Sequence, residues 1–439
     1  MKYLKWILAL IIISLGVLFY ISYPKLSVLN GYSSKYTTSG VYTAGRDFKS
    51  VDTLDNASGL IGLADDKLNR EDKSVTSSVY GLNPRTSIYR EGLGAVLLPK
   101  DYDYKPLGLK PNRNFEIVNE PYPFGHLDPK DTVFSNVNYK KLEKVVNRYL
   151  ADGMKTTALL VLHKDHIVAE QYMGGFDENS IFLGWSMTKS ITSTIYGVLH
   201  NKGKINVNDP APITAWANDD RKQITINNLL QMNSGLQWEE IYDEESDATS
   251  MLFEEADMTK STIDNPLTGT PNENWNYSSG TTNLLSGILR QQFNTHQEYL
   301  DFWYSELIDK IGMHSMIVET DIKGNYVGSS YGWATARDWA KLGTLYLHKG
   351  QWNDETIFNE DWYNYALTPT NTSNGRYGAQ IWLNHGGFLP NVPKTMFSFN
   401  GFNGQQVFIL PTKNLVVVRL GLQKIDFNIM LKEIVETID

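Results

Sequence analysis

The sequence GWSMTKSITSTIYGVL, residues 184–199, places a serine and a lysine at the start of an apolar pattern. Apolar side chains recur every three or four residues from Ile191 onward, and no proline follows before Pro210. We therefore predict a buried amphipathic helix that begins near Ser186. Lys189 lies three residues further on and on the same helix face, with its Cβ roughly 5–6 Å from that of Ser186. The pattern thus predicts an amine beside a hydroxyl in the first turn of a helix.

This S-x-x-K pattern suits nucleophilic catalysis. A serine hydroxyl is a weak nucleophile until a base takes its proton, and a desolvated lysine can supply that base. The unpaired N–H groups of a helix start, such as that of Ser186, can stabilise a developing oxyanion. The same four-letter pattern occurs at residues 22–25, where Pro24 makes catalysis implausible. The pattern alone therefore leaves an ordinary polar helix start as the alternative.

Helical and strand patterns alternate on both sides of this stretch. Residues 142–150 and 224–232 predict helices, and residues 158–169 predict a hairpin. His163 and His166 flank the hairpin turn, where a metal site and a plain turn are alternatives. Because no third ligand lies nearby in the sequence, we expect neither a metal nor a cofactor.

A second segment with candidate chemistry reads PNENWNYSSG at residues 271–280. Tyr277 and Ser279 lie in a turn before the apolar helix expected at residues 284–289, a place from which side chains can face a cleft. A phenol beside a lysine ammonium can act as a base and then as an acid. A structural tyrosine is the alternative.

A third segment reads FNGFNGQ at residues 399–405 and opens an apolar strand that runs to Leu410. Residues 411–414 turn the chain into a second strand over residues 415–420, and Asp426 caps a final helix. Glycines at a strand start either mark a bulge or let a substrate backbone pair with the strand edge.

Residues 238–257 contain nine carboxylates and neither lysine nor arginine. This stretch has two interpretations: it is either a solvated loop or an acidic edge of a binding cleft that favours a cationic substrate. The carboxylates are those of Glu239, Glu240, Asp243, Glu244, Glu245, Asp247, Glu254, Glu255 and Asp257.

Composition narrows the class of protein. The chain has 439 residues, a net charge of −9 and no long basic run. Its sequence therefore contains no basic region of the kind that binds nucleic acid. It has no cysteine, which excludes a disulfide scaffold, cysteine-based zinc sites and thiol catalysis.

The N-terminal part predicts a membrane anchor. Residues 1–5 carry two lysines and form a cytoplasmic tail, and residues 6–23 contain no charge and predict a transmembrane signal-anchor. A cleaved signal peptide is the alternative, although an A-x-A site is missing. Residues 24–137 predict an extracytoplasmic extension, in which 63–78 form a helix or linker, and residues 138–439 form the main domain outside the cytoplasm.

In their order and spacing, the motifs at Ser186, Tyr277 and Gly401 resemble those of the serine β-lactamase and DD-peptidase superfamily. The chain looks most like its class C β-lactamase-related branch, which includes membrane-anchored 6-aminohexanoate-oligomer hydrolases and esterases. The resemblance covers about residues 138–439. It implies an α+β fold, with an antiparallel sheet flanked by helices and a mostly helical insertion between the first and third motifs.

The resemblance also implies roles for the matching residues. Ser186 would be the acylated nucleophile, Lys189 its proton-relay partner and Tyr277 the general base. The N–H groups of Ser186 and Phe402 would form the oxyanion hole. The expected substrate-binding residues are Ser279, Gly401, Asn403 and Gly404. Ser279 stands where class C β-lactamases have asparagine, which is a departure from the pattern.

The third motif departs further, because Phe399-Asn400-Gly401 stands where β-lactamases have Lys-Thr-Gly. The lysine that would hold a β-lactam carboxylate is absent, and losing such a contact costs about 1.5–3 kcal/mol. We therefore expect a membrane-anchored serine hydrolase acting on a small-molecule amide or ester, rather than a β-lactamase. A non-hydrolytic penicillin-recognising sensor or cell-wall-binding protein of the same fold is the alternative.

Overall fold

A computed structural model describes residues 2–57 and 59–438 of the chain. Contacts divide the chain into two compact units, the first made of Met1–Pro106 with Glu239–Ala256 and the second of Leu107–Trp238 with Asp257–Asp439. Residues 107–137, which the sequence analysis assigned to the extension, therefore pack with the second unit.

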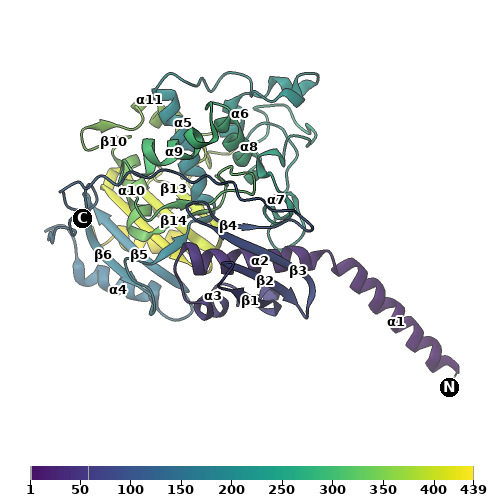
Figure 1. Cartoon of the computed structure of the whole chain (residues 1–439). Helices are drawn as coiled ribbons and strands as arrows, with labels where there is room; N and C mark the ends of the chain where they lie inside the picture. The colour runs from purple at the N-terminus through teal and green to yellow at the C-terminus, as the bar shows by residue number, and fades with distance from the viewer. Residues whose placement is uncertain (1, 58, 439) are drawn as a thin grey trace. The chain divides into compact units, whose positions relative to one another are not determined.

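The first unit combines helices with a four-stranded antiparallel sheet in the order β1-β2-β3-β4 (Figure 1). Its elements are α1 (Lys2–Ser22), α2 (Lys25–Thr38), a π-helical turn (Ser39–Thr43), α3 (Phe48–Leu54), a 3-10 turn (Gly59–Leu63), β1 (Asp65–Asn69), β2 (Ser74–Val79), β3 (Leu82–Arg90), β4 (Gly94–Leu97) and α7 (Asp247–Glu254).

Helix α1 covers the segment that we expected to be the transmembrane anchor. Within the described residues, however, the structure contains no helix with both the length and the apolar character needed to cross a bilayer. The expectation of a membrane-spanning helix over residues 6–23 is therefore not supported.

Helix α2 packs on the sheet of the first unit largely through hydroxyl groups. The Oγ of Ser34 donates to the carbonyl of Val75 at 2.8 Å, and the Oγ of Ser87 donates to the carbonyl of Ser34 at 2.8 Å. Asp66 of β1 accepts a hydrogen bond from Ser33 Oγ at 2.8 Å. Residues 65–69 and 74–79 pair with each other as antiparallel strands, so the expectation of a helix or linker over residues 63–78 is wrong.

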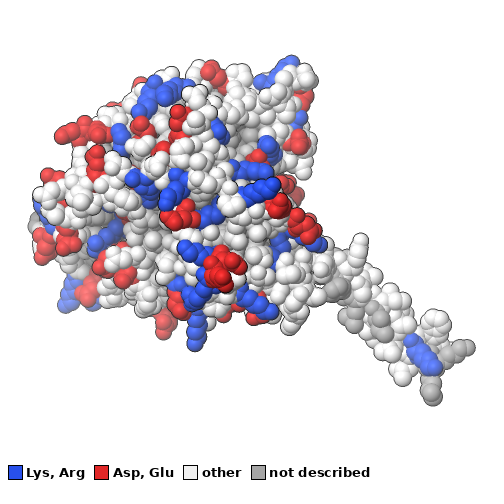
Figure 2. Space-filling model, viewed as in Figure 1, with Lys and Arg blue, Asp and Glu red and all other residues white. Residues whose placement is uncertain are grey.

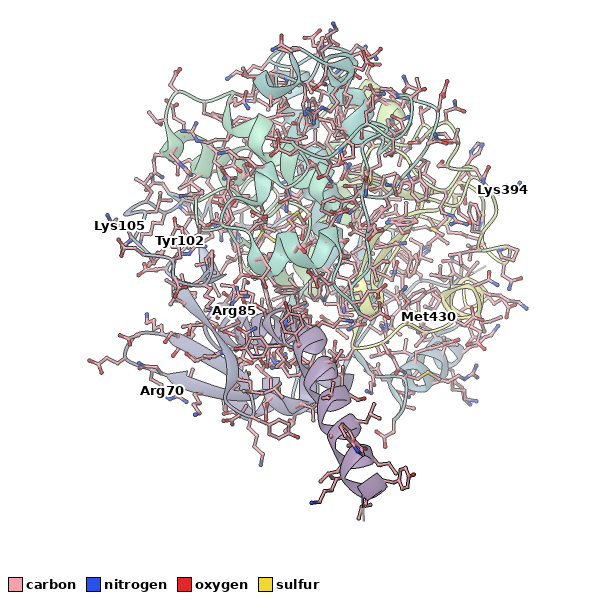
Figure 3. All side chains as sticks on the ribbon, turned by 90° about the vertical axis from the view of Figure 1, so that its right-hand side faces the viewer. Arg70, Arg85, Tyr102, Lys105, Lys394 and Met430 are labelled. Atoms are coloured by element: carbon pink, nitrogen blue, oxygen red, sulfur yellow. The ribbon has the colours of Figure 1, made fainter. Side chains whose placement is uncertain are left out.

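The acidic stretch contributes α7 to the first unit. Ser246 caps this helix, and Asp247 Oδ2 accepts from the N–H of Glu239 at 2.8 Å. Glu254 forms an ion pair of 2.9 Å with the buried Arg85 of β3 (Figure 3). Part of the stretch is thus held within the first unit, and its effect on substrate preference stays a prediction.

The second unit is built on a six-stranded sheet in the order β12-β13-β14-β15-β5-β6, antiparallel throughout. The strands are β5 (Thr156–His163), β6 (His166–Tyr172), β12 (Trp382–Leu383), β13 (Phe397–Gly401), β14 (Gln405–Leu410) and β15 (Leu415–Gly421). The long apolar runs of β5, β14 and β15 are buried on both faces, as helices on both sides of a sheet require. The sequence prediction of an α+β fold with a helix-flanked antiparallel sheet is confirmed.

Helices cover each face of this sheet. On one face, α4 (Tyr139–Leu150) and α12 (Phe427–Val435) form a core with Phe408 and Val417, and Met430 of α12 is fully buried there (Figure 3). On the other face, α10 (Ala336–Leu347) packs closely against the sheet. A Cβ added to its Gly343 would lie 2.8 Å from the side chain of Val407 in β14. The expected cap of α12 is present, because the Asp426 carboxylate accepts from the N–H of Ile429. The side chain of Thr335 caps α10 in the same way, by accepting from the N–H of Asp338.

The remaining elements of the second unit carry the candidate site (Figure 1). The helices are α5 (Thr188–Asn201), α6 (Ile226–Leu230), α8 (Ser279–Arg290), α9 (His296–Trp303) and α11 (Glu360–Ala366). The short strands are β7 (Ile181–Leu183), β8 (Ile317–Val318) and β9 (Gly332–Thr335), which form a sheet in the order β7-β9-β8, and the pair β10 (Gln351–Trp352) and β11 (Glu355–Thr356).

The charges seen on one face of the molecule are mixed in sign. Figure 2 shows lysine and arginine interspersed with aspartate and glutamate rather than gathered into one basic field. A surface of this kind supplies no concentrated positive potential on that face to attract a polyanion.

Candidate active site

Ser186 lies in a 3-10 turn (Trp185–Met187) that leads directly into α5. The Nζ of Lys189 is 3.0 Å from Ser186 Oγ, 2.8 Å from Ser279 Oγ and 2.9 Å from the carbonyl oxygen of Ser329. Lys189 is 1 % exposed, whereas Ser186 is partly exposed. The first two predicted residues are thus brought together, with the lysine buried and the serine partly exposed.

The backbone before Ser186 is held in an unusual conformation. Trp185 has a φ of 48°, which is rare for a bulky residue and persists only where the surroundings fix it. The hydroxyl of Thr188 donates to the carbonyl of Trp185 at 2.7 Å and accepts from the N–H of Gly332 at 2.9 Å. Gly184 is tied to the same strand, because its N–H donates to the Gly332 carbonyl at 2.8 Å. These bonds fix the direction in which Ser186 projects.

Ser279 opens α8 and is fully buried. The preceding Ser278 caps the helix by accepting from the N–H of Thr281 at 2.9 Å, which leaves Ser279 in the first turn, facing Lys189. The structure therefore gives Ser279 a bond to the lysine amine, and its expected contact with a substrate stays a prediction.

Tyr277 presents its ring to the lysine. The Nζ of Lys189 lies over the ring, 4.8 Å from its centroid. The ring also packs against Tyr377 at 5.7 Å and Trp382 at 5.2 Å between centroids. Tyr277 therefore lies in the same cluster as Ser186 and Lys189, and its role as the general base stays a prediction.

The end of β13 lies against the loop that carries Ser186. A Cβ built on Gly401 would meet the carbonyl oxygen of Gly184 at 2.1 Å. The next residue, Phe402, packs its ring edge-on against Trp185, with 5.5 Å between centroids. The two residues expected to supply oxyanion donors, Ser186 and Phe402, thus belong to backbone segments in direct contact.

The other two residues expected to bind substrate lie in the turn after β13. Asn403 and Gly404 both adopt positive φ, and their carbonyls accept from the buried guanidinium of Arg419 at 3.4 and 3.0 Å. Burial lowers the pKa of Arg419 to about 10, so the group stays charged at neutral pH. The structure shows a packing role for Gly404 against Arg419, and substrate contacts of Asn403 and Gly404 stay predictions.

These segments match one known family. A sequence model described as Beta-lactamase matches residues 142–421, which is more than half of the chain. The chain belongs to the beta-lactamase family. Among the residues that the structure describes, the matched region contains the S-x-x-K serine and lysine, the Tyr-x-Ser segment and Gly401. The chain is thus a hydrolase of the beta-lactamase fold.

Solved structures with this beta-lactamase fold include proteins of several activities. A putative 6-aminohexanoate-dimer hydrolase from Bacillus anthracis is 20% identical, with a TM-score of 0.57, and the match covers 74% of this chain and 88% of that one. A family VIII carboxylesterase is 14% identical, with a TM-score of 0.55, covering 71% and 99%. A penicillin-binding protein homologue from Caulobacter crescentus is 16% identical, with a TM-score of 0.53, covering 71% and 99%. At these identities the likeness establishes the fold.

Two parts of this beta-lactamase-family site were missed by the sequence analysis. Ser329 contacts Lys189 through its backbone carbonyl. Every residue has such a carbonyl, so the residue type at position 329 does not reveal the contact. Tyr377 meets the ring of Tyr277 edge-on and Trp382 packs against it at a tilt, both from positions about 100 residues later in the chain. An aromatic residue alone does not indicate which ring it will meet.

Proposed function

We propose that this chain is a serine hydrolase that cleaves an amide or ester bond through an acyl-enzyme on Ser186. One observation carries the proposal: Lys189 Nζ lies 3.0 Å from Ser186 Oγ while also contacting Ser279 and Ser329. An ammonium has three N–H donors, whereas a neutral amine has two and a lone pair. With its two N–H groups on Ser279 and Ser329, a neutral Lys189 would point its lone pair at Ser186 Oγ.

The proposed acylation follows from this arrangement. The Ser186 hydroxyl proton passes to Lys189 as Oγ bonds to the substrate carbonyl carbon, and the carbonyl oxygen becomes an oxyanion. The N–H groups of Ser186 and Phe402 are the proposed donors to that oxygen. When the intermediate collapses, the bond to the leaving nitrogen or oxygen breaks, and the leaving group takes the proton from Lys189 through Tyr277. Water then attacks the acyl carbon and gives a proton to Lys189, which returns it to Ser186 Oγ as the bond between Oγ and the acyl carbon breaks.

The proposed bond class rests on two further observations. Phe399, which occupies the position of the β-lactamase lysine, is fully buried and packs against Tyr346 with 5.3 Å between centroids. That position supplies no cation for a β-lactam carboxylate. The similar structures include a 6-aminohexanoate-dimer hydrolase and a carboxylesterase, so an amide or ester of a flexible chain is the proposed substrate.

Covalent labelling tests the nucleophile. A fluorophosphonate probe should label the wild-type protein and release one fluoride per chain, and Ser186→Ala should lose both labelling and ester turnover. Ser305→Ala is the matched control, because Ser305 is an exposed serine in the same unit. Labelling and turnover that survive in Ser186→Ala would refute the proposal.

Kinetics separate the hydrolase from a non-hydrolytic sensor of the same fold. A chromogenic ester should give steady turnover after any initial burst, since a hydrolase releases its acyl group to water. A single stoichiometric burst without turnover would identify a protein that stays acylated and would replace the proposed function.

A further inference from the structure

A buried arginine supports the turn that follows β13, which is made of residues 402–404. Arg419 of β15 is fully buried. Its guanidinium donates to five uncharged oxygen atoms: Thr156 Oγ1 at 3.0 Å and the carbonyl oxygens of Met154 at 3.0 Å, Asn403 at 3.4 Å, Gly404 at 3.0 Å and Gln423 at 2.8 Å. The guanidinium therefore ties the 402–404 turn to the start of β5 and to the segment after β15.

This guanidinium has no acidic partner. Among the described residues, no carboxylate forms an ion pair with Arg419; burial lowers the pKa of the group, and no acidic side chain raises it. Removing a charge from water without a counter-ion is costly. A neutral side-chain amide could bond to the same carbonyls without that cost, so the buried positive charge requires an explanation.

Two glycines leave room for the guanidinium. A Cβ added to Gly404 would lie 2.7 Å from Arg419 Nη1, and a Cβ added to Gly421 would lie 2.5 Å from Arg419 Cζ. Both distances are shorter than the 3.4 Å at which ordinary contact begins. Gly404 also has a φ of 84°, a conformation that glycine adopts without strain. The charged group therefore lies directly against the backbone of the 402–404 turn.

The same turn carries the proposed oxyanion donor, the N–H of Phe402. The carbonyl of Phe402 accepts from Gln405 Nε2 at 3.3 Å. Arg419 holds the next two carbonyls, those of Asn403 and Gly404. Three successive carbonyls of the turn are therefore bonded to buried side chains.

The start of the turn lies against the loop of the nucleophile. Gly401 contacts the carbonyl of Gly184, and the Phe402 ring packs against Trp185 with 5.5 Å between centroids. The Phe402 N–H thus lies between this contact and the carbonyls that Arg419 holds. An oxyanion donor acts when it is already held at the position where charge develops, so this restraint bears directly on the proposed reaction.

The guanidinium also has the charge that an oxyanion hole requires. As Ser186 Oγ bonds to the substrate, the carbonyl oxygen of the substrate becomes negative. A buried cation is weakly screened and so stabilises a nearby negative charge more than an exposed cation does. Arg419 bonds to Gly404, two residues beyond Phe402, and its charge has no counter-ion until the oxyanion forms.

We propose that Arg419 is a positioning residue of the oxyanion hole: it holds the turn that carries the Phe402 N–H, and it keeps an uncompensated positive charge beside that turn. The inference rests on the proposed function, in which Ser186 is acylated.

Three substitutions separate the hydrogen bonds of Arg419 from its charge. Arg419→Met removes both, Arg419→Gln keeps N–H donors without charge, and Arg419→Lys keeps the charge with N–H donors. Fluorophosphonate labelling measures the maximal rate constant kinact, the half-saturating concentration KI and the fraction of protein that reacts. Each rate is measured on protein whose fold is verified by near-ultraviolet circular dichroism, and the Gln and Lys variants carry the test if Arg419→Met fails to fold.

In Arg419→Met and Arg419→Gln, kinact should fall by about tenfold or more while KI stays within about twofold, because the lost interaction acts on the transition state. Arg419→Lys should react about tenfold faster than Arg419→Gln, as expected of a unit charge several ångströms from the oxyanion at an effective dielectric constant of about 20. A role in folding alone would lower the fraction that reacts and leave kinact of the folded protein unchanged.

Val417→Ala is the matched control, because Val417 is buried in the same strand and packs in the core with α4 and α12. It should keep the wild-type kinact. A wild-type kinact in folded Arg419→Gln, or equal values in the Gln and Lys variants, would overturn the inference and leave the hydrolase standing. Wild-type protein that reacts with neither the probe nor a 4-nitrophenyl ester would overturn both proposals.

Discussion

Replacing Gly401 by alanine should damage the site without removing any functional group. The new Cβ would lie 2.1 Å from the carbonyl oxygen of Gly184, whereas ordinary contact begins at 3.4 Å. The obstacle is backbone, and Gly184 is itself fixed, because a Cβ there would strike the Trp339 ring at 2.2 Å and its N–H is bonded to Gly332. The end of β13 and the Ser186 loop must therefore separate by roughly 1 Å, and a displacement of that size can cost about 100-fold in rate.

We expect kcat/KM for a 4-nitrophenyl ester and the rate of fluorophosphonate labelling to fall together by about 100-fold in Gly401→Ala. Overpacking should also lower the free energy of unfolding by about 1–3 kcal/mol, measured by urea titration. Gly174→Ala is the matched control, since no atom lies within 4 Å of a Cβ at that position. Wild-type kinetics in Gly401→Ala would show that contact between β13 and the Ser186 loop does not set the geometry of the reaction.

Three further changes have defined outcomes. Lys189→Met should reduce the labelling rate by at least about 100-fold, because no amine remains to accept the Ser186 proton; a labelling rate within a factor of ten of wild type would contradict this. Arg419→Met should leave the carbonyls of Asn403 and Gly404 unpaired and lower the free energy of unfolding by about 3 kcal/mol in a urea titration, and no loss would contradict the packing role. Burial raises the pKa of Asp321 to about 7, above the value of about 3.9 that an aspartate has in an unfolded chain, so as the pH rises the unfolded chain releases this proton first. The protonated Asp321 stabilises the fold fully at low pH, and this stabilisation is lost as the pH rises to about 7. The free energy of unfolding of the wild-type protein should therefore fall by up to about 4 kcal/mol relative to that of Asp321→Asn. Parallel pH profiles of the two proteins in urea titrations would contradict this prediction.

The sequence predicts those helices and strands in which buried apolar residues recur at a regular spacing. The apolar runs that became β14 and β15 and the helix after Lys189 follow from spacing alone, because burial on a sheet or helix imposes a period. Helix α2 and strand β1 escaped prediction because hydroxyls rather than hydrocarbons pack them, and Asp66 reads as a surface charge although Ser33 bonds to it. The contact between Trp382 and Tyr277 also escaped, since it joins distant segments.

The interface of α2 has a thermal consequence. Among the buried residues of this helix, Tyr36 is the one hydrophobic side chain, and the others are polar or glycine. Exposing apolar surface raises the heat capacity of a protein, whereas exposing polar surface lowers it. Separating α2 from its sheet therefore carries a small heat-capacity increment compared with opening the Leu-, Val- and Ile-rich core around β15. Hydrophobic stabilisation weakens on cooling. A fall in temperature therefore destabilises the core of the second unit more than it destabilises the interface between α2 and its sheet.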